Sequence, residues 1–153
     1  MKLVDRYVYP RSSREKIDGL RHYSIDGSTS KLPSVTTVIG QTKAKRDKDA
    51  IDAWIARVGE TEAKRIRIEA EQRGTAMHKN LENFIRGELS PDLTNRGREG
   101  KFMADIIRDR GLNRCSDVYG VEAVLYYPEL YAGSCDLVAD IDDKMSIVDF
   151  KQT

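Results

Sequence analysis

Two β-patterned runs constrain the fold of this chain most, because each carries an aspartate at a place where strands rarely have one. They lie within residues 131–151, YAGSCDLVADIDDKMSIVDFK, on either side of the turn candidate Asp142-Asp143. Asp136 lies in the first run and Asp149 in the second. Acidic residues are depleted in strands, and like charges directly opposite each other destabilise a sheet. We therefore expect a compensating group, and a divalent cation is the first candidate.

The length of the turn decides whether the two carboxylates meet. If the loop has two residues, Ile141 pairs with Lys144, and Asp136 then lies opposite Asp149 with Cβ atoms about 4.5–5.5 Å apart. Lys151 shares their face because side chains alternate along a strand. A three-residue loop would instead make the aspartates diagonal neighbours. The other face is apolar and carries Cys135, Leu137, Ala139, Ile141, Val148 and Phe150.

Length and charge narrow the class of protein. The 153 residues suffice for one domain with a hydrophobic core. Charged residues make up 33% of the chain but the net charge is only +1, so local basic patches must carry any argument for nucleic-acid binding. There is no run of 18 apolar residues and no apolar signal core, so we expect no membrane partner. The two cysteines are not in a metal-binding spacing, which favours reduced thiols in the cytoplasm.

Residues 1–31 show weak patterns, and we expect this segment to be irregular. Residues 7–9, YVY, are predicted to form a short strand that stops at Pro10. Residues 23–25 are predicted to form a second strand, which ends at the turn signal of residues 26–27, DG.

Residues 32–39, LPSVTTVI, predict a short capped helix. Pro33 fixes the turn before it, and Ser34 is a suitable N-cap. The hydroxyls of Ser34, Thr36 and Thr37 are also suited to binding a phosphate. A capped turn without a ligand is an equally good interpretation of the same residues.

Residues 44–57 have the apolar spacing of an amphipathic helix that ends at Gly59. Four cations crowd its start, namely Lys43, Lys45, Arg46 and Lys48. Cations at this position oppose the helix dipole, so the cluster indicates an anionic ligand. The alternative is a solvated basic face.

A longer helix is predicted over residues 61–85, ending at Gly87, and it carries His78. Gly74 lies four residues before the histidine. A glycine inside a helix costs about 1 kcal/mol relative to alanine, so it indicates the close approach of another element or a ligand. A lone helical histidine is more often structural than catalytic. Glu82, four residues later, makes an HxxxE pair in which the carboxylate would orient the imidazole.

A further helix is expected from Pro91 or Thr94 to Arg110, with Gly111 as its C-cap. The two possible starts have different causes. Pro91 follows a serine that can act as an N-cap, whereas Thr94 can act as the N-cap itself.

A strand at residues 118–127, VYGVEAVLYY, would place a third carboxylate beside the two aspartates. If residues 128–130 form a three-residue loop, Glu122 lies opposite Asp136. Glu122, Asp136 and Asp149 then form one carboxylate row across three adjacent antiparallel strands. The alternative is that Glu122 is an ordinary solvent-facing strand residue.

Such a row suits the hydrolysis of a phosphodiester. Mg²⁺ takes oxygen ligands and is bound by one or two carboxylates plus substrate phosphate. A metal-bound water has a lowered pKa and can attack phosphorus. Lys151 would position that water or stabilise charge on the phosphorane. On the residues alone, however, a D-x-K triplet is a weak signal, and a structural role is the alternative.

Four segments together resemble the PD-(D/E)XK nuclease superfamily. Residues 133–136, GSCD, and residues 149–151, DFK, are similar to its acidic and D-x-K motifs. Residues 73–78, RGTAMH, resemble the RG-x-x-x-H helix motif of the RecB-like exonuclease branch. Residues 33–39, PSVTTVI, resemble an opening shared by the mitochondrial genome maintenance exonuclease and its phage relatives. The resemblance implies an α/β (α+β) restriction-endonuclease-like core, a mixed sheet with an antiparallel three-strand meander flanked by helices.

The resemblance also implies a role for each matching residue. The implied metal ligands, for Mg²⁺ or Mn²⁺, are Asp136, Asp149, His78 and the backbone carbonyl of Phe150. The implied catalytic residues are Lys151, Asp149, Asp136, His78 and, by a weaker match, Glu122. Ser34 and Thr36 would contact the phosphate backbone of DNA. The complete predicted DNA-binding set is Ser34, Thr36, Thr37, Arg73, Lys43, Lys45 and Arg46. The iron–sulfur members of the branch need four cysteines, so no such cluster is expected.

The implied activity is a metal-dependent DNA exonuclease in phage-type replication, repair or recombination, acting on single strands or free ends in the host cytoplasm. One alternative is an endonuclease of the same superfamily. Another is an inactive, truncated DNA-binding fold that binds through Lys43, Lys45, Arg46, Arg57, Lys64 and Arg67. Family members continue beyond the D-x-K lysine with a helix carrying a glutamine–tyrosine motif. We therefore expect residues 1–153 to be a single nuclease domain, with its core in residues 32–153 and its carboxy-terminal part missing or supplied by another chain.

Overall fold

The computed structural model describes residues 1–152, and the chain packs as two compact units built from discontinuous segments. The first unit comprises Met1–Tyr7, Thr61–Glu122 and the residues from Cys135 onward. The second unit comprises Val8–Glu60 and Ala123–Ser134. The predicted single domain thus corresponds to two packing units, each with its own hydrophobic cluster.

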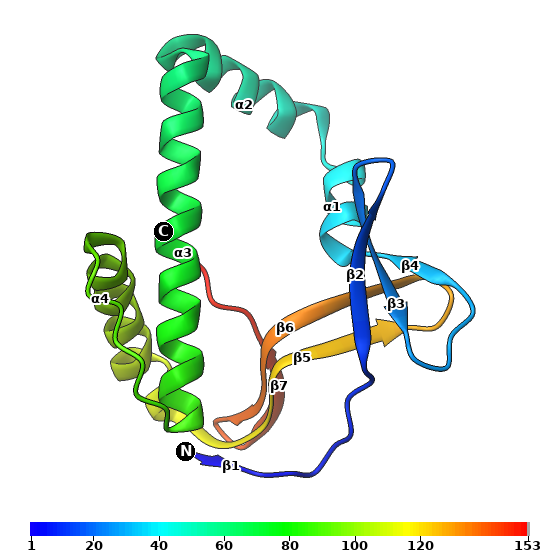
Figure 1. Ribbon diagram of the computed structural model, residues 1–153, viewed down its shortest axis with the longest axis vertical. Coiled ribbons are helices and arrows are strands. Elements are labelled where there is room, and N and C mark those ends of the chain that lie inside the picture. The colour runs from blue at the N-terminus through cyan, green and yellow to red at the C-terminus, as the bar shows by residue number, and fades with distance from the viewer. Residues whose placement is uncertain (153) are drawn as a thin grey trace. The chain divides into compact units, whose positions relative to one another are not determined.

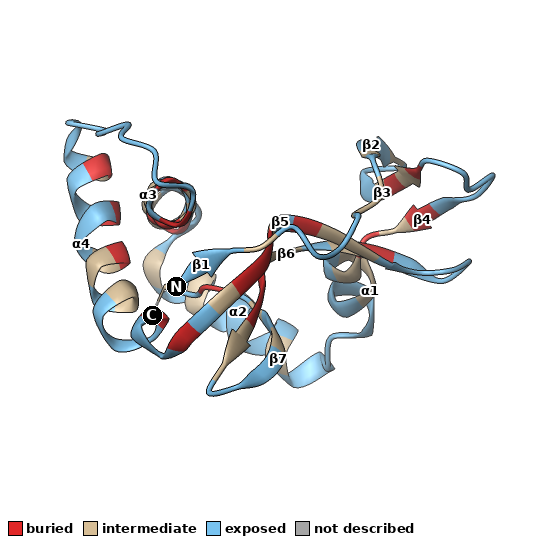
Figure 2. Cartoon of the chain, turned by 90° about the horizontal axis from the view of Figure 1, so that it is seen from below, coloured by how far each residue is buried: buried red, intermediate tan, exposed pale blue. Residues whose placement is uncertain are grey.

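Two helices lie side by side in the first unit (Figure 1). They are α3 (Glu60–Arg86) and α4 (Asn95–Arg110). Small residues let them approach, because a Cβ on Gly100 of α4 would lie only 2.5 Å from the Cβ of Ala76 on α3. The buried positions of α4 face α3 (Figure 2). The short 3-10 helix η1 (Leu112–Arg114) then leads into the sheet.

A mixed sheet with the strand order β1-β5-β6-β7 lies mainly in the first unit, and residues 123–134 of β5, β6 and the loop between them belong to the second. The strands are β1 (Lys2–Leu3), β5 (Cys115–Tyr127), β6 (Tyr131–Ile141) and β7 (Lys144–Val148). β1 pairs in parallel with β5, and β6 pairs antiparallel with β7. The predicted α/β (α+β) class is confirmed, as is a mixed sheet in which β5, β6 and β7 are consecutive neighbours.

The β6–β7 hairpin has the predicted two-residue loop. Asp142 and Asp143 both have positive φ, 48° and 61°, as a type I′ turn requires. Ile141 consequently pairs with Lys144, and the ladder runs on to the pair of Leu137 and Val148. The register prediction is therefore confirmed, and Asp149 is the first residue beyond the last ladder pair.

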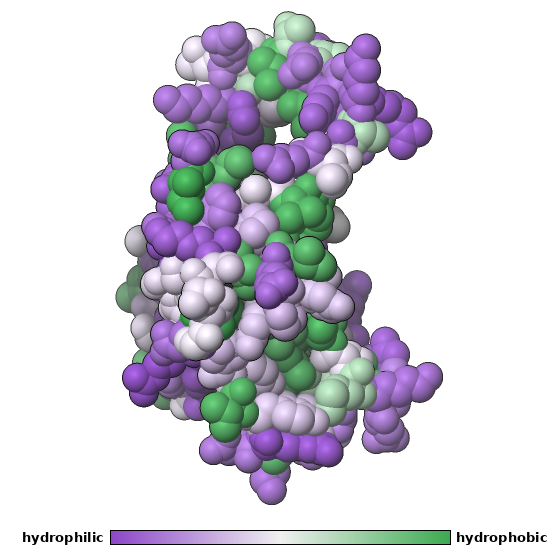
Figure 3. All heavy atoms as spheres, turned by 90° about the vertical axis from the view of Figure 1, so that its right-hand side faces the viewer, coloured by the Kyte–Doolittle hydropathy of each residue, from purple (hydrophilic) through white to green (hydrophobic). Residues whose placement is uncertain are grey.

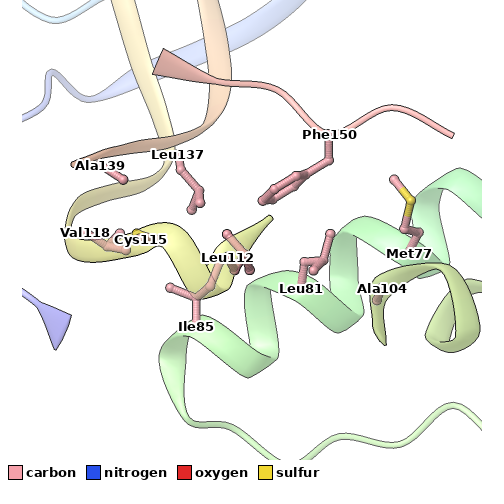
Figure 4. Close-up of a cluster of buried hydrophobic side chains, with 10 residues drawn as sticks. All are labelled: Met77, Leu81, Ile85, Ala104, Leu112, Cys115, Val118, Leu137, Ala139 and Phe150. Atoms are coloured by element: carbon pink, nitrogen blue, oxygen red, sulfur yellow. The ribbon is translucent and has the colours of Figure 1, made fainter. Parts of the chain in front are cut away.

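The apolar face of this hairpin packs against α3 and contributes to the main hydrophobic cluster. Its buried members are Met77, Leu81, Ile85, Ala104, Leu112, Cys115, Val118, Leu137, Ala139 and Phe150. Phe150 comes from the segment after β7, and its ring points toward Leu137 of β6 and Leu81 of α3 (Figure 4). Burying side chains of this size contributes about 1.5–3 kcal/mol each. The predicted apolar face of residues 135–150 is thus the surface that joins the hairpin to the helix.

The second unit contains a separate antiparallel sheet with the order β2-β3-β4. Its strands are β2 (Ser12–Ile17), β3 (Leu20–Ile25) and β4 (Lys31–Pro33). The expectation of an irregular segment over residues 1–31 is therefore wrong. The cause is a tight turn at Asp18-Gly19, whose positive φ values of 51° and 78° let Ile17 pair with Leu20. Residues 7–9, predicted as a strand, are outside every strand.

The second unit also holds two helices, α1 (Val35–Thr42) and α2 (Lys45–Val58). Their predicted starts and ends are confirmed to within a few residues, and so are those of α3. Of the two proposed starts for α4, the later is correct. Thr94 is the N-cap because its hydroxyl accepts the amide hydrogen of Gly97 at 3.0 Å, so Pro91 lies before the helix.

Among the described residues, no helix is both long enough and apolar enough to cross a membrane. Hydrophobic residues form separate patches between charged side chains on the face shown in Figure 3.

Candidate metal centre

Three potential metal ligands from three elements meet in the first unit. They are His78 of α3, Glu122 of β5 and Asp136 of β6, and one candidate ligand atom from each lies within 4.8 Å of the others. An imidazole nitrogen and two carboxylates are a suitable donor set for a divalent cation. Two members of the predicted carboxylate row thus lie in one group with the predicted histidine.

Glu122 reaches this group from an unusual backbone conformation. Its φ of 53° is in the left-handed region, although it lies within β5. Such a conformation is uncommon for a glutamate and costs roughly 1–3 kcal/mol. The side chain is exposed, in contrast to its buried neighbour Ala123. The local departure from regular strand geometry therefore occurs at the residue whose carboxylate lies beside His78 and Asp136.

His78 and Asp136 are directly hydrogen-bonded. The Nδ1 atom of His78 lies 2.9 Å from Oδ1 of Asp136, with side chains that are 33% and 12% exposed. This bond raises the pKa of His78 above its ordinary value of 6.5, and burial opposes the increase only in part. Burial raises the pKa of Asp136, but hydrogen bonds from His78 and the Phe150 amide lower it below 3.8 overall. Asp136 is therefore held as the carboxylate, the form that binds cations.

Residues 149–151 follow β7 and approach the same group. The backbone N–H of Phe150 donates to Oδ2 of Asp136. The Phe150 ring lies edge-on to the His78 ring at 6.2 Å between centroids. The segment thus orients Asp136 from one side while the histidine orients it from the other.

Asp149 and Lys151 pair with each other at the surface. Nζ of Lys151 lies 2.5 Å from Oδ2 of Asp149, and the two side chains are 73% and 56% exposed. Among the described residues, the three-ligand group around His78 does not include Asp149, which follows the last ladder pair.

The predicted orienting residue for His78 was Glu82, and the structure gives a different partner. Oε2 and Oε1 of Glu82 bind Lys79 and Arg86, each at 3.1 Å. The residue that orients His78 is Asp136, which lies 58 residues further along the chain. No spacing in the sequence can indicate such a distant pair. Glu82 instead contributes to the wall of a small recess, which is lined by His78, Glu82, Ile85, Val121, Glu122, Asp136, Leu137 and Phe150.

The hydroxyl residues predicted to bind phosphate lie in the second unit. Ser34 is buried, and its hydroxyl is the N-cap of α1, accepting the Thr37 amide hydrogen at 3.0 Å. Its oxygen also lies 2.9 Å from the Thr36 hydroxyl and 2.8 Å from the Thr37 hydroxyl. These contacts match the capped-turn interpretation of the sequence, since the Ser34 hydroxyl bonds to both threonine hydroxyls.

The predicted basic DNA contacts divide between the units. Lys43, Lys45 and Arg46 are exposed around the start of α2 in the second unit, where Arg46 lies 3.7 Å from Asp47. Arg73 belongs to α3 in the first unit and is 4.0 Å from Glu99.

One residue of the first unit was missed by the sequence patterns. The side-chain amide of Gln152 donates to the backbone carbonyl of Ala70 on α3 at 2.6 Å and packs over Gly74. The glycine was the available signal, because its position inside a helix indicated the close approach of another element. The sequence did not indicate which residue approaches.

Comparison with protein-family models and with curated proteins gives no relative from which a role for these residues could be taken. No protein-family model matches the chain, and no curated protein matches it either.

Proposed function

We propose that this chain is a metal-dependent hydrolase of phosphodiester bonds in DNA, with His78, Glu122 and Asp136 as its cation ligands. One observation carries the proposal: three ligand atoms from three elements lie within 4.8 Å of one another beside an Asp-x-Lys segment. Ligands gathered from distant parts of a chain are costly to hold together without a function, since like charges repel and burial penalises them.

The donor set fits Mg²⁺ or Mn²⁺. A bound divalent cation supplies a water of lowered pKa and offsets the charge of a phosphate. Carboxylates suit both ions, whereas the imidazole of His78 favours the transition metal. Asp149 and the carbonyl of Phe150 would complete the shell from the adjoining segment, in keeping with the resemblance to PD-(D/E)XK nucleases.

Asp136 and Lys151 would each have a separate role beside the cation. Asp136 is fixed by its bonds to His78 and to the Phe150 amide, so its carboxylate is oriented before a cation binds. The ammonium of Lys151 is paired with Asp149 at the surface and would contact a phosphate oxygen or the attacking water. Such preorganised charges act where negative charge develops in the transition state.

The substrate class rests on the resemblance rather than on a bound ligand. We infer a DNA exonuclease that acts on single strands or free ends, in the cytoplasm of a host cell if phage-encoded. The test is the degradation of end-labelled single-stranded DNA with Mg²⁺ or Mn²⁺. Activity should be lost in EDTA and in Asp136→Asn and Lys151→Ala variants. Full activity in EDTA would refute the proposal.

A matched control variant and a second substrate separate the possible outcomes of this assay. Lys144→Ala removes an exposed lysine from the same hairpin, at the start of β7, and should leave activity unchanged. A covalently closed single-stranded circle resists an exonuclease, so its cleavage would identify an endonuclease instead. Salt-sensitive DNA binding without any metal-dependent cleavage would identify an inactive DNA-binding fold.

A further inference from the structure

A side-chain amide links the segment after β7 to helix α3, in addition to the packing of Phe150. Nε2 of Gln152 donates to the backbone oxygen of Ala70 at 2.6 Å, across 82 residues of sequence. Figure 1 shows the corresponding trace running from β7 to α3. Ala70 lies two turns before His78 on the same helix, so the contact joins the D-x-K segment to the element that carries the histidine.

Gly74 makes this contact possible. It lies four residues after Ala70, where a side chain would crowd the Ala70 carbonyl from the next turn of the helix. A Cβ built on Gly74 would lie 3.1 Å from Nε2 and 3.6 Å from Cδ of Gln152. Alanine would therefore require the amide to shift by a few tenths of an ångström at its contact with the Ala70 carbonyl. The glycine that is unfavourable for the helix leaves room for the amide.

The contact fixes a short segment from its far end. The β6–β7 ladder stops at Leu137 and Val148, and Phe150 then enters the hydrophobic cluster and donates its N–H to Asp136. Gln152 holds the chain two residues later. Lys151 thus lies between two anchored residues, although its own side chain is exposed.

We propose that Gln152 is a positioning residue for the metal centre: through Ala70 and across Gly74 it holds the segment whose Phe150 amide orients Asp136. Its loss would loosen that segment, so Asp136 would meet a cation in a less ordered position. The metal-affinity part of the inference rests on the proposed function, whereas the anchoring of the segment does not.

Two substitutions break the contact from opposite sides. Gln152→Glu keeps the side-chain shape but replaces the donor by an acceptor that repels the Ala70 carbonyl. Gly74→Ala leaves Gln152 intact and crowds its amide with one methyl group. Gln72→Glu is the matched control, because it makes the same chemical change at an exposed position of the same helix.

The first measurement is Mn²⁺ binding to the full chain by isothermal titration calorimetry. Both variants should bind about threefold to tenfold more weakly than the parent, the range expected for one hydrogen bond, and the control should not. Gly74→Ala should at the same time keep or raise the thermal midpoint, because alanine is the better helix former. A purely structural role predicts instead that affinity is unchanged or falls only with stability. Equal Mn²⁺ affinity in all the proteins would overturn the inference.

A double-mutant cycle tests whether the two residues act through one contact. In a Gln152→Ala background, Gly74→Ala should have no further effect on Mn²⁺ affinity. Fully additive losses would contradict the inference, because they would mean that each residue acts independently.

A second measurement needs no metal. Hydrogen exchange of the Phe150 amide should be at least threefold faster in Gln152→Glu and Gly74→Ala than in the parent protein. If the parent fails to bind Mn²⁺, the proposed function fails, and this exchange rate alone decides whether Gln152 anchors the segment. Unchanged exchange in both variants would refute the anchoring.

Discussion

Asp136→Asn should separate the structural and metal-binding roles of the centre. The carboxylate lies 2.9 Å from His78 Nδ1, is 12% exposed and accepts the Phe150 amide hydrogen. An asparagine keeps an acceptor for Phe150 but removes the charge that strengthens the bond to His78. A hydrogen bond to a charged group contributes about 1.5–3 kcal/mol, and the 33% exposure of His78 argues for the low end of that range.

We therefore expect a loss of about 1–1.5 kcal/mol in the metal-free protein, which for a chain of this length lowers Tm by about 2–6 °C. Bound metal should raise the Tm of the parent protein. At a free Mn²⁺ concentration one hundred times Kd, the parent gains about 2.7 kcal/mol, or about 5–11 °C in Tm. The variant has lost a ligand and should show little of this gain.

The assay is a thermal melt followed by circular dichroism, in EDTA and in excess Mn²⁺. Asp140→Asn is the control: it makes the same change on the same strand, where Asp140 accepts the Tyr119 hydroxyl hydrogen at 2.6 Å. It should retain the full Mn²⁺-dependent gain. If Asp136→Asn retained that gain as well, Asp136 would not be a ligand and the proposed centre would be wrong.

Four further predictions concern residues of the first unit. In a metal-free NMR titration, His78 should have a pKa above 6.5 and should return toward that value in Asp136→Asn. The raised pKa of His78 stabilises the folded protein below pH 6.5, and this stability is lost as pH rises through the folded pKa. The lowered pKa of Asp136 stabilises the folded protein above pH 3.8, and this stability is lost as pH falls through the folded pKa. The contribution of His78 and Asp136 to the free energy of unfolding should therefore be largest between pH 3.8 and pH 6.5. Gly100→Ala should lower the free energy of unfolding measured in urea by about 1–3 kcal/mol, because its Cβ would lie 2.5 Å from the Cβ of Ala76 and 2.7 Å from the Met77 nitrogen. An unchanged urea midpoint would contradict the close packing of α3 and α4. Calorimetry should find tighter binding of Mn²⁺ than of Mg²⁺, because one donor is an imidazole. His78→Gln should reduce the difference in affinity between the two ions.

The elements that the sequence predicts well are those whose cause is local. The β6–β7 register follows from Asp142 and Asp143, which adopt the positive φ values of a two-residue turn. The end of α3 follows from Gly87, with φ of 71°. The strand β2 was missed because SSREKI has weak apolar alternation, and its pairing with β3 depends on a turn at Asp18-Gly19 that was not recognised.

The centre was predictable only in part, because its geometry is tertiary. The pattern of residues 131–151 indicated that Asp136 needs a partner, and the helix pattern drew attention to His78. Their direct bond joins residues 58 positions apart, so it depends on how the hairpin packs on α3. The left-handed backbone of Glu122 has no sequence signal at all, since glutamate rarely adopts it.

The composition of the main hydrophobic cluster sets an order of events during synthesis. Met77, Leu81 and Ile85 of α3 are translated well before their partners Leu137 and Phe150. At roughly 5–20 residues per second, the helix waits several seconds after Ile85 for Phe150 to be made. Its apolar stripe is exposed throughout that time, while the β6–β7 hairpin, once made, can close within about 1–10 μs. On the ribosome, α3 thus presents apolar side chains to which a chaperone can bind before the cluster is complete.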